Sequence, residues 1–141
     1  MTVADTSSTA VAVAETVLVV EDDVLVRAEI SQYLRECGYR VVEAGSADEA
    51  LIVLQEPELK VDVVLSAVEM PGSMDGFGLS QWVRKHRQGL DVILVGNPAR
   101  AADAAADLCE AGPLLAKPYD PQLIVDRISR LAAERNSRKP K

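Results

Sequence analysis

The stretch VDVVLSAVEMPGSMDG, from Val61 to Gly76, decides the fold. It begins as a short, mainly apolar run from Val61 to Leu65, which is the pattern of a strand buried on both faces. It then breaks into a loop that holds Pro71, Gly72 and Gly76. Parallel α/β sheets place their ligand sites where a strand ends in such a loop before a helix. The stretch therefore predicts a strand that ends at Ser66 and a functional site just beyond it.

Outward from this stretch, the sequence alternates between strand and helix patterns five times. The predicted strands are Thr16–Val20, Tyr39–Ala44, Val61–Ser66, Asp91–Val95 and Leu114–Ala116. The predicted helices are Val24–Cys37, a segment capped by Ser46 and Glu49 that ends before Pro57, Phe77–Arg87, Arg100–Glu110, and a last one that starts at Pro121 after the cap Asp120. This alternation predicts a parallel sheet covered on both faces, a flavodoxin-like (βα)5 three-layer sandwich with strand order 2-1-3-4-5.

Composition and charge indicate one globular domain. The 141 residues are 48% hydrophobic and 26% charged, so the chain is large enough to form a buried core. Because aromatic residues are few, this core must consist mainly of aliphatic side chains. The net charge of −7 argues against nucleic acid as a partner. No apolar run is long enough to span a membrane, so no membrane association is expected.

The ends of the chain differ in composition from the domain between them. Residues 1–14 are small, polar and aperiodic, and we expect them to be disordered; they do not resemble a secretory signal. Residues 15–134 form the predicted domain, and residues 135–141 form a basic tail expected to be frayed. Cys37 and Cys109 lack the spacing of a metal site, and we interpret them as reduced thiols of a cytoplasmic protein.

The predicted strand order brings the ends of the first, third, fourth and fifth strands to one edge. These ends carry the pocket candidates Glu21, Asp22, Ala67, Gly96 and Lys117. The adjacent carboxylates of Glu21 and Asp22 favour binding of a hard cation that prefers oxygen ligands. The alternative interpretation is that both residues belong to a solvated loop without a ligand. Asp23, one residue later, is expected to cap the first helix.

Three motifs together carry a family resemblance. The sequence from Asp62 to Gly76, the acidic pair Glu21-Asp22, and Lys117-Pro118-Tyr119 resemble the receiver domain of two-component response regulators. The resemblance implies that Glu21, Asp22 and the backbone carbonyl of Glu69 would hold a magnesium ion. It also implies that Lys117 would pair with a phosphorylated aspartate, and that a histidine kinase or another signalling protein would be the partner.

Three positions depart from the family's pattern. Ala67 stands where the family has the aspartate that accepts the phosphoryl group. Gly96 replaces the Thr or Ser at the end of the fourth strand, and Leu114 replaces the aromatic switch residue of the fifth. The side chain of Ser66 should point to the opposite face from Ala67, and Asp62 lies roughly 16 Å back along the strand. Neither residue is a replacement nucleophile. Because Ala67 also removes one of the family's three protein ligands for the metal, magnesium binding should be weak, and no cofactor is required.

Three functions compete. The first is a stand-alone receiver-like signalling domain that is not phosphorylated at Ala67, is not an enzyme and acts through protein contacts. The second is an ordinary single-domain response regulator whose aspartate was mutated to alanine, the wild type accepting phosphate from a histidine kinase. The third, an enzyme or ligand-binding domain on the same fold, is weakest, because the sequence has no Gly-rich phosphate loop and no nucleophile–base pair. Homodimer formation is left open.

Overall fold

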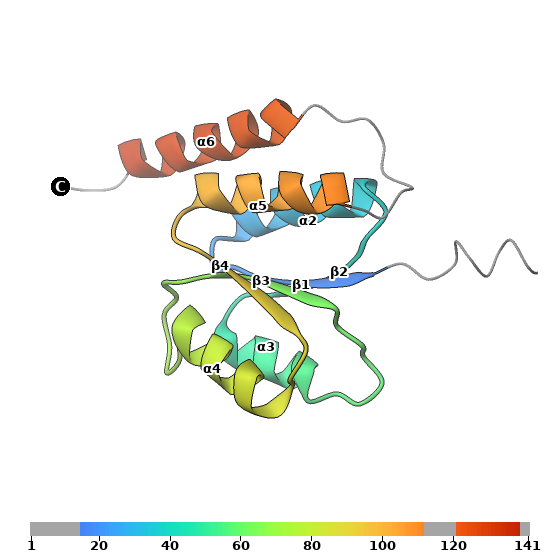
Figure 1. Cartoon of the computed structure of the whole chain (residues 1–141). Coiled ribbons are helices and arrows are strands. Elements are labelled where there is room, and N and C mark those ends of the chain that lie inside the picture. Colours follow the sequence, from blue (N-terminus) through green and yellow to red (C-terminus); the bar gives the residue numbers. More distant parts are fainter. Residues whose placement is uncertain (1–14, 112–120, 139–141) are drawn as a thin grey trace, which may run out of the picture.

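Four parallel strands form the centre of the protein in the computed structural model, which describes residues 15–111 and 121–138 (Figure 1). The strands lie in the order β2-β1-β3-β4. Their bounds are β1 Thr16–Val20, β2 Arg40–Ala44, β3 Val63–Ala67 and β4 Asp91–Val95. This confirms the first four positions of the predicted order, whereas the predicted strand Leu114–Ala116 lies outside the described residues.

Strand β3 begins at Val63, two residues later than the sequence pattern suggested. Asp62 is nevertheless tied to β1, because its Oδ2 accepts a hydrogen bond from the Thr16 amide at 2.8 Å. Its own amide donates to the Thr16 carbonyl at 2.9 Å. The side chain of Asp62 is therefore used at the start of the strand, at the opposite end from Ala67.

The described helices follow the predicted alternation. They are α2 Val24–Glu36, α3 Ala47–Leu54, α4 Gly76–His86, α5 Pro98–Ala111 and α6 Pro121–Arg138. Polar side chains cap three of them as the sequence predicts or allows. Asp23 Oδ1 accepts from the Leu25 and Val26 amides, Ser46 Oγ from the Glu49 amide, and Asp75 Oδ1 from the Gly78 amide. Each cap satisfies backbone N–H groups that have no partner within the helix.

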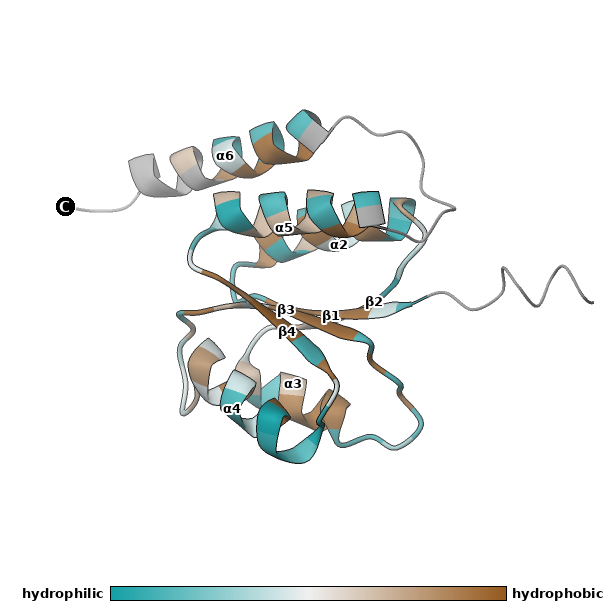
Figure 2. Cartoon of the chain, in the orientation of Figure 1, coloured by the Kyte–Doolittle hydropathy of each residue, from teal (hydrophilic) through white to brown (hydrophobic). Residues whose placement is uncertain are grey.

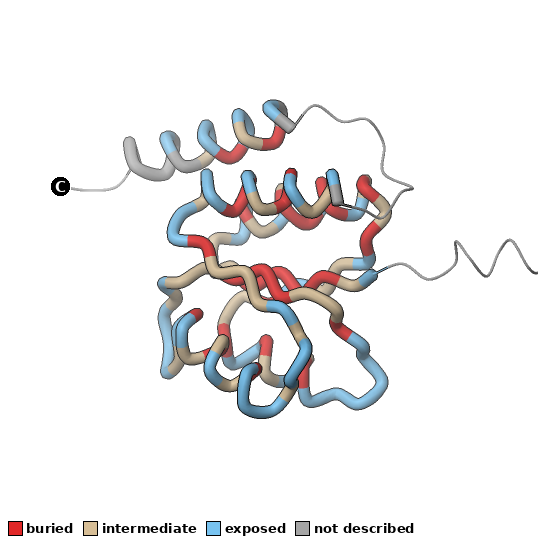
Figure 3. The backbone as a smooth tube through the Cα atoms, in the orientation of Figure 1, coloured by how far each residue is buried: buried red, intermediate tan, exposed pale blue. Residues whose placement is uncertain are grey.

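The core is divided between the two faces of the sheet. Alternate residues of β1 point to opposite faces. Val17 and Val19 belong to a cluster with α2, α5 and α6, whereas Leu18 and Val20 belong to a cluster with α3 and α4. The two central strands, β1 and β3, are largely apolar and buried, whereas β2 and β4 at the edges are partly exposed (Figures 2 and 3). Burial on both faces is what the apolar strand patterns predicted.

Helix α6 departs from the simple three-layer arrangement. Helix α5 covers the same sheet face as α2, and α6 packs on these two helices as a further layer (Figure 1). Ile124 and Ile128 of α6 are buried in the cluster that α2 and α5 form. The three-layer expectation therefore holds for α2 to α5 but not for α6. Helix α6 also continues to Arg138, into the segment expected to be frayed.

The two cysteines correct a prediction. Cys37 and Cys109 form a disulfide, with their Cα atoms 5.6 Å apart, whereas the sequence was interpreted as holding two reduced thiols. They are 72 residues apart, so no local pattern pairs them. Their proximity follows from the packing of α5 on α2, which brings the last turn of α5 to the C-cap of α2.

Trp82 and His86 lie one turn apart on α4. Trp82 is partly buried against the cluster that α3 and α4 form. The imidazole of His86 is exposed and stacks on the indole with ring centroids 4.5 Å apart. No helix among the described residues is long and apolar enough to cross a bilayer.

Gly76 should be the least replaceable glycine at the end of β3. Its amide donates to the Val68 carbonyl at 2.8 Å. A Cβ at this position would meet the Ala67 carbonyl oxygen and lie 2.9 Å from the Val68 Cα, both of which are backbone atoms. We expect Gly76→Ala to lower the free energy of unfolding by about 1–3 kcal/mol in urea denaturation.

The matched control for this substitution is Gly96→Ala. A Cβ at Gly96 would have no atom within 4 Å. The control should change stability by less than about 1 kcal/mol. Equal stability of the two variants would contradict the close approach at Gly76.

Candidate functional site

The ends of β1, β3 and β4 enclose a cavity of about 340 Å³ at one edge of the sheet. Its lining consists of Glu21, Asp22, Ala67, Glu69, Val95, Gly96, Asn97 and Pro98. Four of the predicted pocket residues, Glu21, Asp22, Ala67 and Gly96, are thus brought together. The fifth, Lys117, lies outside the described residues, as does the predicted switch position Leu114. The cavity stands where parallel strands are expected to place a ligand site.

Glu21 follows β1 directly and is partly buried. Its Oε2 accepts a hydrogen bond from the Asp23 amide at 2.9 Å. Burial raises the pKa of the Glu21 carboxyl to about 7, and the hydrogen bond and negative charge of Asp22 act in the same direction, as does the charge of Asp23. The Asp23 amide opposes this shift. At neutral pH, both the charged and the neutral form of the Glu21 carboxyl group are therefore populated.

Arg27 supports the end of β1 from α2, a role that sequence reasoning missed. Its Nη1 donates to the Glu21 carbonyl at 2.8 Å, and its Nε lies 3.2 Å from Glu43 Oε1. Arg35 Nη2 lies 3.1 Å from the other oxygen of Glu43. The available signal was the position of Arg27 one turn after the Asp23 cap, where a long side chain can reach back to the strand end.

Ala67 is the last residue of β3 and lies opposite Val95 of β4. Its methyl group supplies the cavity with no atom that could bind a metal or attack phosphorus. Ser66 does not replace it, because its side chain is fully buried and its Oγ donates to the Ala67 carbonyl at 2.9 Å. Gly96 likewise presents no hydroxyl, and the Asn97 side chain is engaged by the Arg100 amide at 2.9 Å.

The residues present do not make a complete magnesium site. Mg²⁺ requires octahedral oxygen ligands and dehydrates reluctantly. Within residues 15–111 and 121–138, no group of three or more His, Cys, Asp or Glu side chains is arranged to hold a metal ion. Glu21 and Asp22 offer two carboxylates, and the raised pKa of Glu21 weakens its competition for a cation. The lining side chains therefore fall short of a preformed metal centre.

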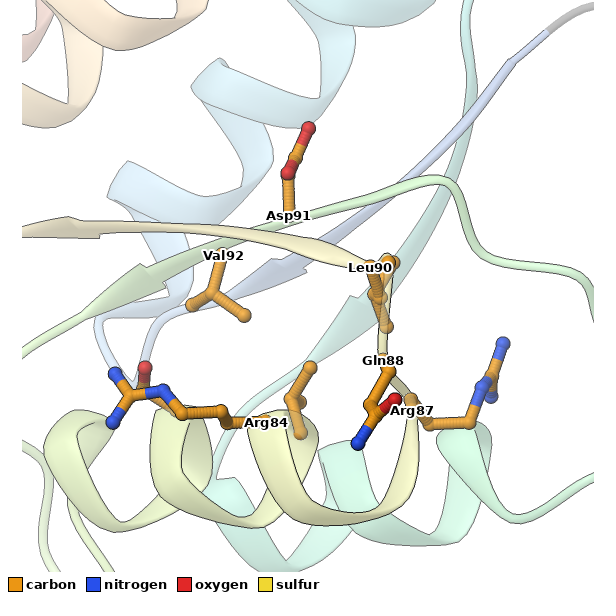
Figure 4. Close-up of a pocket in the computed structure, with 9 residues that line it drawn as sticks. Arg84, Arg87, Gln88, Leu90, Asp91 and Val92 are labelled. Carbon is orange, nitrogen blue, oxygen red and sulfur yellow. The ribbon is translucent and has the colours of Figure 1, made fainter.

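A second hollow, of about 390 Å³, lies between α4 and β4 (Figure 4). Figure 4 shows Arg84 and Arg87 extending in opposite directions along α4, so two cations do not converge on one ligand. Arg87 Nη1 is already bonded to the Leu54 carbonyl at 2.8 Å. Asp91 points away from α4, on the other side of β4. The hollow consequently lacks the convergent polar groups of a binding site.

Comparison with known proteins agrees with this geometry. Residues 17–129 match the family model described as response regulator receiver domain. The chain is 34% identical over 119 residues to the transcriptional regulatory protein AruR of Pseudomonas aeruginosa, covering 82% of this chain and 48% of AruR. It is 42% identical over 89 residues to the sensor kinase CckA of Brucella abortus, covering 63% of this chain and 9% of CckA. The chain thus spans about half or less of the length of these relatives.

A solved structure shows the same fold. The crystal structure of a putative response regulator from Chloroflexus aurantiacus J-10-fl superposes with a TM-score of 0.55 at 32% sequence identity. The superposition covers 86% of this chain and 99% of that one. Because the family match spans the described sheet together with the cavity at its edge, the chain belongs to the response regulator receiver domain family.

Proposed function

We propose that this receiver domain transmits signals through protein contacts and is not phosphorylated at the usual position. The observation that carries the proposal is Ala67, which stands at the end of β3 in the cavity between the acidic pair and Gly96. A covalent phosphoryl intermediate needs a nucleophilic oxygen. The side chains of Ala67 and Gly96 offer none.

Two exposed apolar residues beside the cavity support a role in protein contact. Val24 and Leu25, in the first turn of α2, are 62% and 55% exposed. Only the cap Asp23 separates them from Glu21 and Asp22, so a partner that approaches the cavity would also cover an apolar surface. The partner we propose is a histidine kinase or another two-component signalling protein in the cytoplasm. The net charge of −7 makes nucleic acid a poor partner for this domain.

Loss of the phosphoryl chemistry extends beyond the nucleophile in this proposal. The resemblance assigns a hydroxyl to the position of Gly96 and an aromatic ring to that of Leu114, and both are absent from the sequence. A ligand shifts a conformational equilibrium only through contacts that differ between the two states. If the nucleophile were restored, the two groups that respond to the phosphoryl group in the family would still be absent. Lys117 remains the proposed cation of the pocket.

Phosphoryl transfer gives the most direct test. After incubation with magnesium and a small phosphodonor, intact-mass measurement should show no mass gain for this chain. The matched variant Ala67→Asp should gain one phosphoryl group, because a carboxylate then faces the acidic pair. The amide chemical shifts of α5 should change little when this variant becomes phosphorylated. Labelling of the unchanged chain would refute the proposal, and large α5 shifts in the labelled variant would favour an ordinary receiver inactivated by substitution.

Magnesium affinity should be low in this chain. Two carboxylates and the Glu69 carbonyl leave most of the coordination shell to water, so half-saturation is expected at about 1 mM or above. The amide shifts of Glu21, Asp22 and Glu69 would report binding in a magnesium titration. Ala67→Asp should bind more tightly, since it adds a third carboxylate. Saturation of the unchanged chain at micromolar magnesium would contradict the incomplete ligand set.

The buried carboxyl of Glu21 should make stability depend on pH. Its pKa rises from 4.5 to about 7 on folding, so the folded state binds the proton more tightly than the unfolded state. The stabilisation from this proton is present below pH 4.5 and is lost as the pH rises through 7.

Glu21→Gln keeps an acceptor for the Asp23 amide but removes the titration. In metal-free buffer, the variant should exceed the unchanged chain in stability by about 1 kcal/mol at pH 8, a value reduced for partial solvent exposure. The two chains should be closer in stability at pH 4.5. A constant difference across this range, measured by urea denaturation, would show that Glu21 does not carry the shift.

A further inference from the structure

Two contacts hold the last turn of α5 to the corner between α2 and β2. The first is the disulfide between Cys37, the C-cap of α2, and Cys109. The second is a hydrogen bond in which the Tyr39 hydroxyl donates to the Leu108 carbonyl at 2.6 Å. Both contacts act on the C-terminal end of α5.

The packing of α5 is otherwise built on alanine. The buried residues of this helix are Ala101, Ala102, Ala105 and Ala106. An alanine methyl buries far less apolar surface than a leucine or isoleucine side chain, so each contact stabilises the helix only slightly. A cross-link between residues 72 apart in sequence acts strongly by comparison, because it removes much of the freedom of the unfolded chain. Without the disulfide, α5 would be held by these alanines, the partly buried Leu108 and its contacts with α2 and α6, so we expect its C-terminal end to loosen first.

The two cysteine residues differ in exposure. Cys37 is 1% exposed, whereas Cys109 is partly exposed at the edge of the core. An external thiolate can reach the Cys109 side of the bond and displace Cys37 as the leaving thiolate. A disulfide that is exposed on one side can exchange stepwise more readily than one that is buried on both sides.

We propose that Cys37 and Cys109 are a reversible thiol–disulfide exchange site that takes a dithiol protein or a small dithiol as its reductant. The reductant's first thiolate attacks the Cys109 sulfur, forming a mixed disulfide and releasing the Cys37 thiolate, which takes up a proton. The second thiol of the reductant then attacks the mixed disulfide and releases Cys109 as a thiol. Two electrons and two protons pass to the protein, and the reductant leaves as a disulfide. Oxidation by a small disulfide reverses both steps.

The N-terminal end of α5, opposite the disulfide, forms part of the cavity wall. Helix α5 begins at Pro98, which lines the cavity together with Gly96 and Asn97. A change in how the Cys109 end is held therefore alters one wall of the candidate site. The functional effect of this coupling between the disulfide and the cavity rests on the proposed function, in which partners bind at the cavity without phosphorylation. The exchange chemistry itself does not depend on it.

Alkylation and hydrogen exchange test the inference on the full chain. The protein is equilibrated with dithiothreitol or with glutathione disulfide under native conditions, quenched, and alkylated with N-ethylmaleimide. Intact mass should show two alkylated thiols after dithiothreitol and none after glutathione disulfide, since the chain has only two cysteines. Amide exchange in residues 98–111 should be at least about tenfold faster in the reduced protein, and β1 and β3 should stay protected. The melting temperature should fall by about 10 °C.

The double variant Cys37→Ala, Cys109→Ala is the matched control. It should exchange as the reduced protein does and should not respond to dithiothreitol. If the disulfide resists dithiothreitol in the native state, or if the reduced thiols do not re-form it, the exchange site is refuted. If the bond exchanges but residues 98–111 keep their protection, its control of α5 is refuted. Neither readout uses a phosphodonor or a partner, so these failures are separate from failure of the proposed function.

Discussion

Strand β1 is the constraint on which the rest of the structure depends. It pairs with β2 on one side and β3 on the other, and its side chains from Val17 to Val20 are almost completely buried. Because alternate residues enter different clusters, this strand joins the helices of both faces to one sheet. It also fixes the place where Glu21 and Asp22 leave the sheet. The strand pairing therefore sets where the cavity lies, and the loops that follow the strands supply most of its lining.

Local sequence signals were sufficient for most of this geometry. The apolar runs predicted each described strand to within two residues, and Asp23 and Ser46 predicted two helix starts, because these signals act over a few residues. The convergence of Glu21, Asp22, Ala67 and Gly96 followed from strand order alone. The proposal that the chain is not phosphorylated at Ala67 rests on equally local information, because it depends on one residue at one strand end.

Features that depend on distant packing could not be predicted in this way. The disulfide requires α5 to lie on α2, and nothing near Cys37 or Cys109 in the sequence encodes that choice. The raised pKa of Glu21 depends on how far the fold buries its carboxyl. The layer formed by α6 depends on the packing of Ile124 and Ile128 against α2 and α5. Each of these is a property of contacts between elements.

The placement of the aromatic side chains has a spectroscopic consequence. The only tryptophan, Trp82, lies against the cluster of α3 and α4, whereas Tyr33 and Tyr39 lie in the cluster of α2, α5 and α6. Indole emission therefore reports one half of the core, and phenol absorption reports mainly the other. A denaturation in which both signals change together would show that the sheet melts as one cooperative unit. A separation of the two would show the helical layer of α2, α5 and α6 loosening while the layer of α3 and α4 stays in place.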